Sequence, residues 1–108
     1  MYGYTMRLSA PPETYQALHN AVQEVVQEDG GGEGLLLHLA YEADGGCVLT
    51  EVWESKEQLD DFNATVFPKA VVRAGLVMDG PQPQPAEFDP IVLMTPRSFD
   101  SDTPPEEV

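Results

Sequence analysis

An Asp-Gly-Gly turn in the middle of the chain constrains the fold more than any other feature. It joins two runs, residues 34–42 and 47–55, that are rich in Leu, Val, Tyr and Trp. Runs of this composition on both sides of an Asp-Gly pair predict the two strands of an antiparallel β-hairpin. The loop has either two residues, Asp44 and Gly45, or the four residues 43–46, and both lengths give the same strand register.

This register places the polar residues of the hairpin opposite each other. We expect His38 to lie across from Glu51, and Leu36 to lie across from Trp53. Side chains alternate along a strand, so these four residues share one face of the hairpin with Ala40 and Leu49. An unpaired buried carboxylate is costly, and a hydrogen bond between His38 and Glu51 offsets that cost.

The chain before the hairpin predicts one strand and one helix. Residues 2–8 alternate between apolar and other side chains, which is the period of a half-buried strand. Pro11 and Pro12 suit the start of a helix, and the glycine run at 30–34 suits its end. A phosphate-binding glycine loop follows a strand and usually carries a lysine, so we interpret this run as structural.

The chain after the hairpin predicts a second helix and a last strand. Ser55 and Gln58 have the spacing of a capping box. Pro68 should kink or interrupt the helix, and a second short segment should follow it up to Gly75. Residues 88–95 resemble a final strand.

The predicted order is therefore β-α-β-β-α-β, which is the order of the ferredoxin-like split βαβ fold of the α+β class. We expect one domain over residues 1–97 and an acidic disordered tail over residues 98–108. Two helices cover only one face of a four-stranded sheet, yet the hairpin is apolar on both faces. We therefore expect a homodimer in which a second copy buries the uncovered face.

The charge of the chain excludes several classes of partner. Nineteen acidic and five basic residues give a formal net charge of −14, which repels nucleic acid and anionic membrane surfaces. One cysteine and two histidines provide no Cys/His framework for a metal ion. We expect a cytoplasmic protein without metal or cofactor, and without a nucleic-acid or membrane partner.

The stretch "VWESKEQLDDFNATVFPKAV" resembles the dimeric α+β barrel superfamily, and especially its antibiotic-biosynthesis-monooxygenase-like branch. The resemblance rests on a strand that ends in Trp-x-Ser, a helix that follows at once with a Leu-x-x-Phe spacing, and a proline late in that helix. It covers residues 1–96. It implies a dimeric barrel of two four-stranded sheets, with a small-molecule cavity between each sheet and its helices.

Three positions compare directly with the monooxygenase-like branch. Trp53 matches a tryptophan that the branch tends to carry at the end of the third strand. The branch often has an asparagine where this chain has Leu49, and a histidine in the second helix where this chain has Phe62. The second difference argues against haem degradation.

The candidate site combines the polar pair with an aromatic lining. His38 would act as a general base, and Glu51 would orient it. Five residues would line the cavity for a small hydrophobic or aromatic ligand: Trp53, Tyr4, His19, Leu49 and Phe62. The alternative is that the polar pair only satisfies itself within the dimer seam or at its rim.

Three functions are compatible with these residues. The first is a cofactor-independent monooxygenase-like enzyme that acts on a phenolic or polyketide-like substrate, which itself supplies electrons to oxygen. The second is a non-redox polyketide cyclase or isomerase, in which the same base removes a proton beside a carbonyl. The third is a ligand-binding dimer without catalysis.

Overall fold

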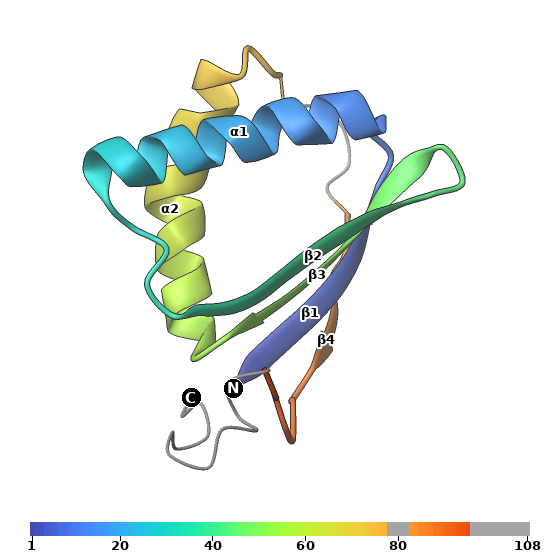
Figure 1. The fold of residues 1–108 in the computed structure, drawn as a ribbon, viewed down its shortest axis with the longest axis vertical. Coiled ribbons are helices and arrows are strands. Elements are labelled where there is room, and N and C mark those ends of the chain that lie inside the picture. Colours follow the sequence, from blue (N-terminus) through green and yellow to red (C-terminus); the bar gives the residue numbers. More distant parts are fainter. Residues whose placement is uncertain (78–82, 96–108) are drawn as a thin grey trace.

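A computed structural model describes residues 1–77 and 83–95 of the chain. Its helices and strands follow the predicted order, with the bounds β1 Tyr2–Leu8, α1 Pro12–Asp29, β2 Leu35–Ala43, β3 Gly46–Trp53, α2 Lys56–Arg73 and β4 Ala86–Phe88. The four strands form one antiparallel sheet in the order β2-β3-β1-β4, and both helices lie on the same side of it (Figure 1). The predicted ferredoxin-like α+β fold is confirmed. Within the described residues, no helix combines the length and apolar character needed to cross a membrane.

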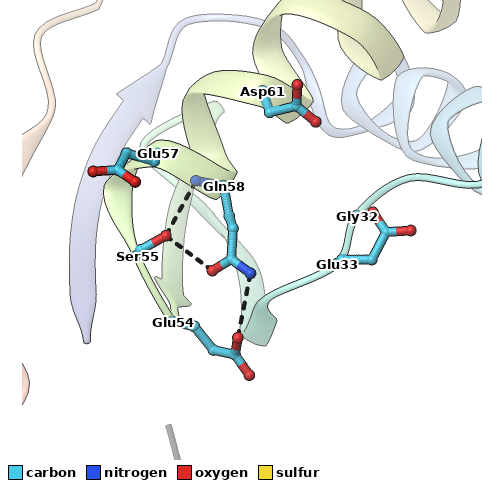
Figure 2. Close-up of a pocket in the computed structure, with 7 residues that line it drawn as sticks. All are labelled: Gly32, Glu33, Glu54, Ser55, Glu57, Gln58 and Asp61. Atoms are coloured by element: carbon cyan, nitrogen blue, oxygen red, sulfur yellow. Dashed lines mark hydrogen bonds between the residues drawn. The ribbon is translucent and has the colours of Figure 1, made fainter.

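The start of α2 follows its predicted signal in part. The Ser55 hydroxyl accepts a hydrogen bond from the Gln58 backbone N–H at 3.3 Å, which satisfies one free amide of the first turn. The Gln58 side chain does not complete the reciprocal half of a capping box. Its Oε1 accepts from the Ser55 hydroxyl at 3.0 Å, and its Nε2 donates to the Glu54 carboxylate at 3.3 Å (Figure 2).

The expected interruption at Pro68 is wrong, because α2 continues through it to Arg73. A proline removes one helical hydrogen bond. Val66 and Ala70 flank Pro68, and both are buried against α1 in an apolar cluster with Ala21 and Val25. This packing holds the helix together on both sides of the proline.

The glycine run between α1 and β2 has a structural role at two positions. A Cβ atom on Gly31 would lie 2.6 Å from a methyl group of Val66, and one on Gly34 would lie 2.4 Å from the Gln58 side chain. Both glycines also have positive φ angles, 106° and 95°, which other residues rarely adopt. The run therefore lets the connection pass close against α2.

The core of the described residues consists of two clusters. One lies between the helices and contains only small and β-branched side chains, those of Ala21, Val25, Val66 and Ala70. The other lies between the sheet and the first half of α2, and its buried members are Tyr4, Leu49, Trp53 and Leu59. Phe62 packs against both clusters and joins them.

The sheet face that points away from the helices carries exposed apolar side chains. Leu37, Leu39 and Tyr41 of β2 are 37 %, 50 % and 53 % exposed. On β1, Gly3 leaves room for the Phe88 ring, because a Cβ atom there would lie 2.3 Å from it. We refer to Leu37, Leu39, Tyr41 and Phe88 as the outer face.

The last strand is much shorter than the sequence suggests. We expected a strand over residues 88–95, but β4 covers only Ala86–Phe88 and pairs with Gly3–Thr5 of β1. Pro90 has no backbone N–H to donate to a sheet, which accounts for the early end. The apolar side chains that follow are exposed: Ile91 at 92 %, Val92 at 67 % and Met94 at 54 %. The expected tail at 98–108 lies outside the described residues.

Candidate functional site

The hairpin turn sets the register that brings the candidate residues together. Asp44 and Gly45 form a two-residue loop, with φ angles of 52° and 80°, and the residues on either side of it pair with each other. Positive φ at both loop positions is the geometry that an Asp-Gly pair favours in a tight hairpin. As expected, His38 then lies across from Glu51.

The pairing of Leu36 with Trp53 is wrong. The ladder contains an irregularity between Leu35 and Leu37, and Leu35 is the residue opposite Trp53. Leu36 is therefore the extra residue of a β-bulge, which shifts the register near the start of β2. The bulge lies beyond the pair of His38 and Glu51, counted from the turn, so it leaves their alignment unchanged.

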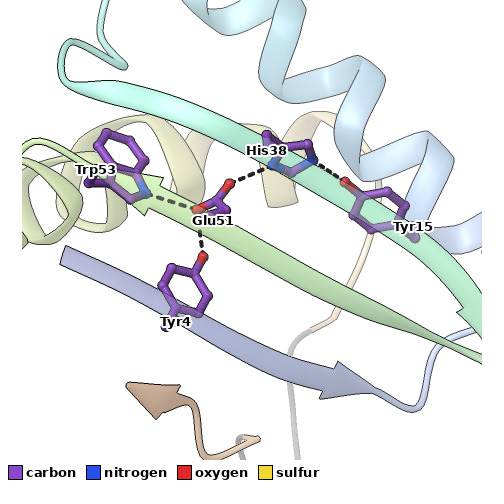
Figure 3. Close-up of polar contacts among 5 residues, drawn as sticks. All are labelled: Tyr4, Tyr15, His38, Glu51 and Trp53. Carbon is purple, nitrogen blue, oxygen red and sulfur yellow. Dashed lines mark hydrogen bonds and ion pairs between the residues drawn. The ribbon is translucent and has the colours of Figure 1, made fainter. Parts of the chain in front are cut away.

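Glu51 is the buried centre of the site, with 6 % of its surface exposed. Its carboxylate accepts three side-chain hydrogen bonds (Figure 3). His38 Nδ1 lies 2.5 Å from one oxygen, and the Tyr4 hydroxyl and Trp53 Nε1 donate to the other at 2.6 Å and 3.0 Å. A buried charge is tolerated when it is hydrogen-bonded in this way.

These contacts decide the ionisation of the carboxylate. Burial alone would raise the pKa of Glu51, but the hydrogen bonds from His38, Tyr4 and Trp53 outweigh it and lower the pKa below its ordinary value. Burial, followed by the charge and hydrogen bond of Glu51, raises the pKa of the Tyr4 hydroxyl. At neutral pH the centre of the site is therefore a carboxylate that faces a neutral phenol.

His38 links this buried carboxylate to α1. Its Nδ1 contacts Glu51, so in the neutral ring Nδ1 carries the proton and Nε2 is the acceptor. The Tyr15 hydroxyl of α1 is hydrogen-bonded to Nε2 (Figure 3). Burial, together with the charges of Glu51 and Cys47, raises the pKa of Tyr15 to about 12, so the phenol stays neutral and donates.

Sequence reasoning missed Tyr15. Its spacing along α1 places it on the side of the helix that faces the sheet, and that spacing by itself indicates only packing. A signal was present, because Tyr15 precedes His19 by four residues and such pairs lie together on a helix surface. In the structure the Tyr15, His19 and His38 rings stack, with the His19 and His38 centroids 5.3 Å apart.

The remaining predicted residues surround this network. Burial, and then the nearby His38, lowers the pKa of His19. Trp53 is fully buried, and its ring contacts the Phe62 ring at a centroid distance of 5.5 Å. Leu49 lies in the same cluster as Tyr4 and Trp53. All seven predicted residues thus belong to one region between the sheet and the helices.

Surface hollows of the described part of the chain lie outside this region. One, of about 520 Å³, lies between the glycine run and the start of α2 (Figure 2). Four carboxylates line it, those of Glu33, Glu54, Glu57 and Asp61, so it would repel a phosphate. Another lies on the second half of α2, over Pro68, Lys69, Val72 and Arg73. Among the described residues, no group of three or more His, Cys, Asp or Glu is placed to hold a metal ion.

Comparison with solved structures supports the fold. The protein Rv0793 of Mycobacterium tuberculosis is 17 % identical over 87 % of this chain and 98 % of its own, with a TM-score of 0.54. A candidate antibiotic biosynthesis monooxygenase of Chloroflexus aurantiacus is 19 % identical over 87 % and 96 %, with a TM-score of 0.59. A structure described as an antibiotic biosynthesis monooxygenase is 18 % identical over 85 % and 100 %, with a TM-score of 0.56.

These similarities confirm the expected resemblance at the level of the fold. No protein-family model matches the chain, and no curated protein matches it significantly. Sequence identities of this size leave the chemistry to be argued from the site itself.

Proposed function

We propose that the protein is a cofactor-independent, monooxygenase-like enzyme that binds a phenolic or polyketide-like substrate and removes its acidic proton. The observation that carries the proposal is the contact of 2.5 Å between His38 Nδ1 and the Glu51 carboxylate. It fixes the tautomer in which His38 Nε2 carries no proton and can accept one. The fold shared with monooxygenase-like structures supports the same reading.

Each residue of the network has a separate part in this chemistry. His38 takes the proton of the substrate hydroxyl, and Glu51 stabilises the imidazolium that forms. Tyr4 and Trp53 hold the carboxylate in place and keep it ionised. The resulting phenolate supplies the electrons that reduce oxygen: a C–O bond forms at a ring carbon, which loses its C–H bond, and the O–O bond breaks. The ring becomes a quinone, and the second oxygen atom leaves as water with the two hydrogens that the substrate has lost. Leu49, Phe62 and the Trp53 ring would form the apolar wall beside the reacting ring, and His19 would stack near it.

Oxygen uptake tests this proposal. A hydroquinone such as 1,4-dihydroxynaphthalene is given to the wild type, to His38→Gln and to Glu51→Gln, and its spontaneous oxidation is subtracted. We expect uptake with the wild type and a large loss in both variants. The double variant should lose little more than either single one, because both residues act on one proton. Glu42→Gln, which makes the same change at an exposed carboxylate on the strand of His38, serves as the matched control.

A binding or structural role is the second candidate, and one observation favours it. The network is closed by the protein's own groups, since Tyr15, Tyr4 and Trp53 satisfy the outer atoms of the His38 and Glu51 pair. If this role holds, both single variants lose stability and oxygen uptake is absent from the wild type. Proton exchange beside a substrate carbonyl without oxygen uptake would instead identify a cyclase or isomerase.

We also propose a homodimer formed through the outer face. Leu37, Leu39, Tyr41 and Phe88 are exposed apolar side chains, and both helices of the described residues lie on the other side of the sheet (Figure 1). Contiguous apolar patches on a sheet face are typical of protein interfaces. The cytoplasm remains the compartment we propose, because the single cysteine, Cys47, is buried and unpaired.

A further inference from the structure

The Tyr15 hydroxyl is hydrogen-bonded to His38 Nε2, the atom on which the proposed function depends. It is a phenol, and it is neutral. A phenolic substrate would have to make the same bond to the same nitrogen before its proton could be removed. The side chain therefore stands where the acidic hydroxyl of a substrate would stand.

We propose that Tyr15 is a specificity-determining residue: its phenol holds the position of the substrate hydroxyl, and a ligand reaches His38 only by displacing it. This inference rests on the proposed function, because it assumes that His38 Nε2 is the base. It adds the chemical class of the ligand, which must bring its own hydroxyl donor to this nitrogen.

The two phenols of the network differ in how easily they are displaced. Tyr4 lies on β1, is 6 % exposed, and donates to the buried Glu51. Tyr15 lies on α1, only three residues after the helix begins, and is partly exposed. The helix start before it has no side-chain cap. Tyr15 can therefore turn toward solvent without opening the core, whereas Tyr4 cannot.

The cost of moving Tyr15 provides the selectivity. Once Tyr15 leaves, His38 Nε2 has lost its donor. A ligand that carries a hydroxyl restores the bond, and the methyl ether of the same ligand leaves the nitrogen unpaired. Sites that hydrogen-bond a ligand hydroxyl discriminate strongly against analogues that lack it.

Ring geometry limits the shape of the ligand. The Tyr15 ring is inclined by 12° to the His38 ring and by 29° to the His19 ring, with centroids 6.2 Å and 6.0 Å away. A ring that replaces Tyr15 would lie in the same nearly parallel arrangement. The structure thus favours a planar phenol or enol over a branched aliphatic alcohol.

Two measurements on Tyr15→Phe test the inference, because this change removes the hydroxyl and keeps the ring. The first is the affinity for 4-nitrophenol, measured by equilibrium dialysis, with 4-nitroanisole as the ether that cannot donate. We expect 4-nitrophenol to bind roughly three- to tenfold more tightly to Tyr15→Phe than to the wild type, the fold-change that one hydrogen bond represents. The ether should bind more weakly than the phenol to both proteins.

The second measurement needs no ligand. Diethyl pyrocarbonate reacts with a free imidazole nitrogen, and mass spectrometry gives its rate at each histidine. We expect His38 to react roughly three- to tenfold faster in Tyr15→Phe. His19 provides the internal reference for both proteins. Tyr2→Phe, which removes a phenol whose exposed hydrogen bond to Glu87 lies outside the network, should leave both measurements at their wild-type values.

Each outcome decides a separate point. Equal or weaker binding of 4-nitrophenol to Tyr15→Phe, or an unchanged rate at His38, overturns the role of Tyr15 and leaves the proposed function standing. Failure of 4-nitrophenol to bind either protein overturns the phenolic substrate class, and the inference with it. Equal affinities for the phenol and the ether would show that Nε2 does not select a hydroxyl, which also overturns the inference.

Discussion

The two faces of the sheet differ in a way that reverses the usual pattern of a half-covered sheet. The face toward the helices buries charged and polar groups, with Glu51 at 6 % exposure and hydrogen-bonded by three side chains. The opposite face exposes Leu37, Leu39 and Tyr41. An antiparallel sheet with one solvated face usually places its polar residues outside. We interpret the inner face as a site and the outer face as an interface.

Strand β2 contributes alternate residues to the two faces. His38 lies between Leu37 and Leu39, so a slip of one residue would exchange the two sets of side chains. The tight turn at Asp44 and Gly45 fixes the register against such a slip. The turn thus determines both the polar network and the apolar surface. Substitutions on the outer face should weaken the homodimer, and substitutions on the inner face should lower the stability of the fold.

The largest effect is expected on the outer face. Leu39→Asp should raise the dissociation constant of the homodimer by more than about a thousandfold, because each dimer would bury two carboxylates at a cost of several kcal/mol each. Analytical ultracentrifugation measures the change. Val72→Asp is the control, since Val72 is 79 % exposed on α2 and outside the outer face. A wild type that stays monomeric at micromolar concentration would contradict the proposed homodimer interface.

On the inner face, Glu51→Ala should lower the free energy of unfolding by about 3 to 5 kcal/mol, because it leaves the buried donors of Tyr4 and Trp53 and the half-buried donor of His38 without an acceptor. Glu51→Gln should cost only about 1 to 2 kcal/mol, since the amide retains an oxygen for Tyr4 and Trp53. Urea denaturation of both variants gives the difference. Similar losses in the two variants would mean that the packing of the side chain matters and its hydrogen bonds do not.

A finer test compares two phenols on one strand. Tyr4→Phe removes a buried donor to Glu51 and should cost about 1 to 2 kcal/mol. Tyr2→Phe removes an exposed bond to Glu87 and should change stability by less than about 0.5 kcal/mol. Thermal and urea unfolding of the two variants provide the measurement. Equal effects would contradict the idea that the polar network is concentrated at Glu51.

The smallest effect is expected in the pH dependence of stability, which should change in acid because of Glu51. The pKa of Glu51 is lower in the folded chain than its ordinary value of 4.5, so its contribution to stability is present above that pH and is lost as the pH falls further. The stability difference between the wild type and Glu51→Gln should therefore narrow below pH 4.5. Unfolding curves of both proteins at several acidic pH values test the trend. A difference that widens in acid would require a raised pKa instead.

Local signals in the sequence predicted most of the fold and part of the site. Asp44 and Gly45 specified the turn, and the turn specified the contact between His38 and Glu51. The bulge at Leu36 carries no local signal, because an extra strand residue looks like any other. The predicted interruption at Pro68 was wrong, since the packing of Val66 and Ala70 that stabilises the helix on both sides of the proline is a tertiary effect.

The hydrogen bond between Tyr15 and His38 could not have been predicted from the sequence for a similar reason. Its contact with His38 joins a helix to a strand 23 residues away, and it depends on how α1 lies over the sheet. Periodicity gives the face of a helix, but it does not give the partner of a single hydroxyl. The apolar run after Pro90 shows the converse, because a good strand composition did not produce a strand.

The bulge at Leu36 has a consequence for the solubility of the chain. In the sheet of the described residues, β2 is an edge strand, and its first six residues, Leu-Leu-Leu-His-Leu-Ala, have the composition of an aggregation-prone segment. A straight edge of this kind would offer a template for pairing with other chains. The bulge breaks the regular spacing of the edge amides and carbonyls, and His38 interrupts the run of leucines. The bulge at Leu36, which shifts the register, therefore also protects the edge of the sheet from pairing with other chains.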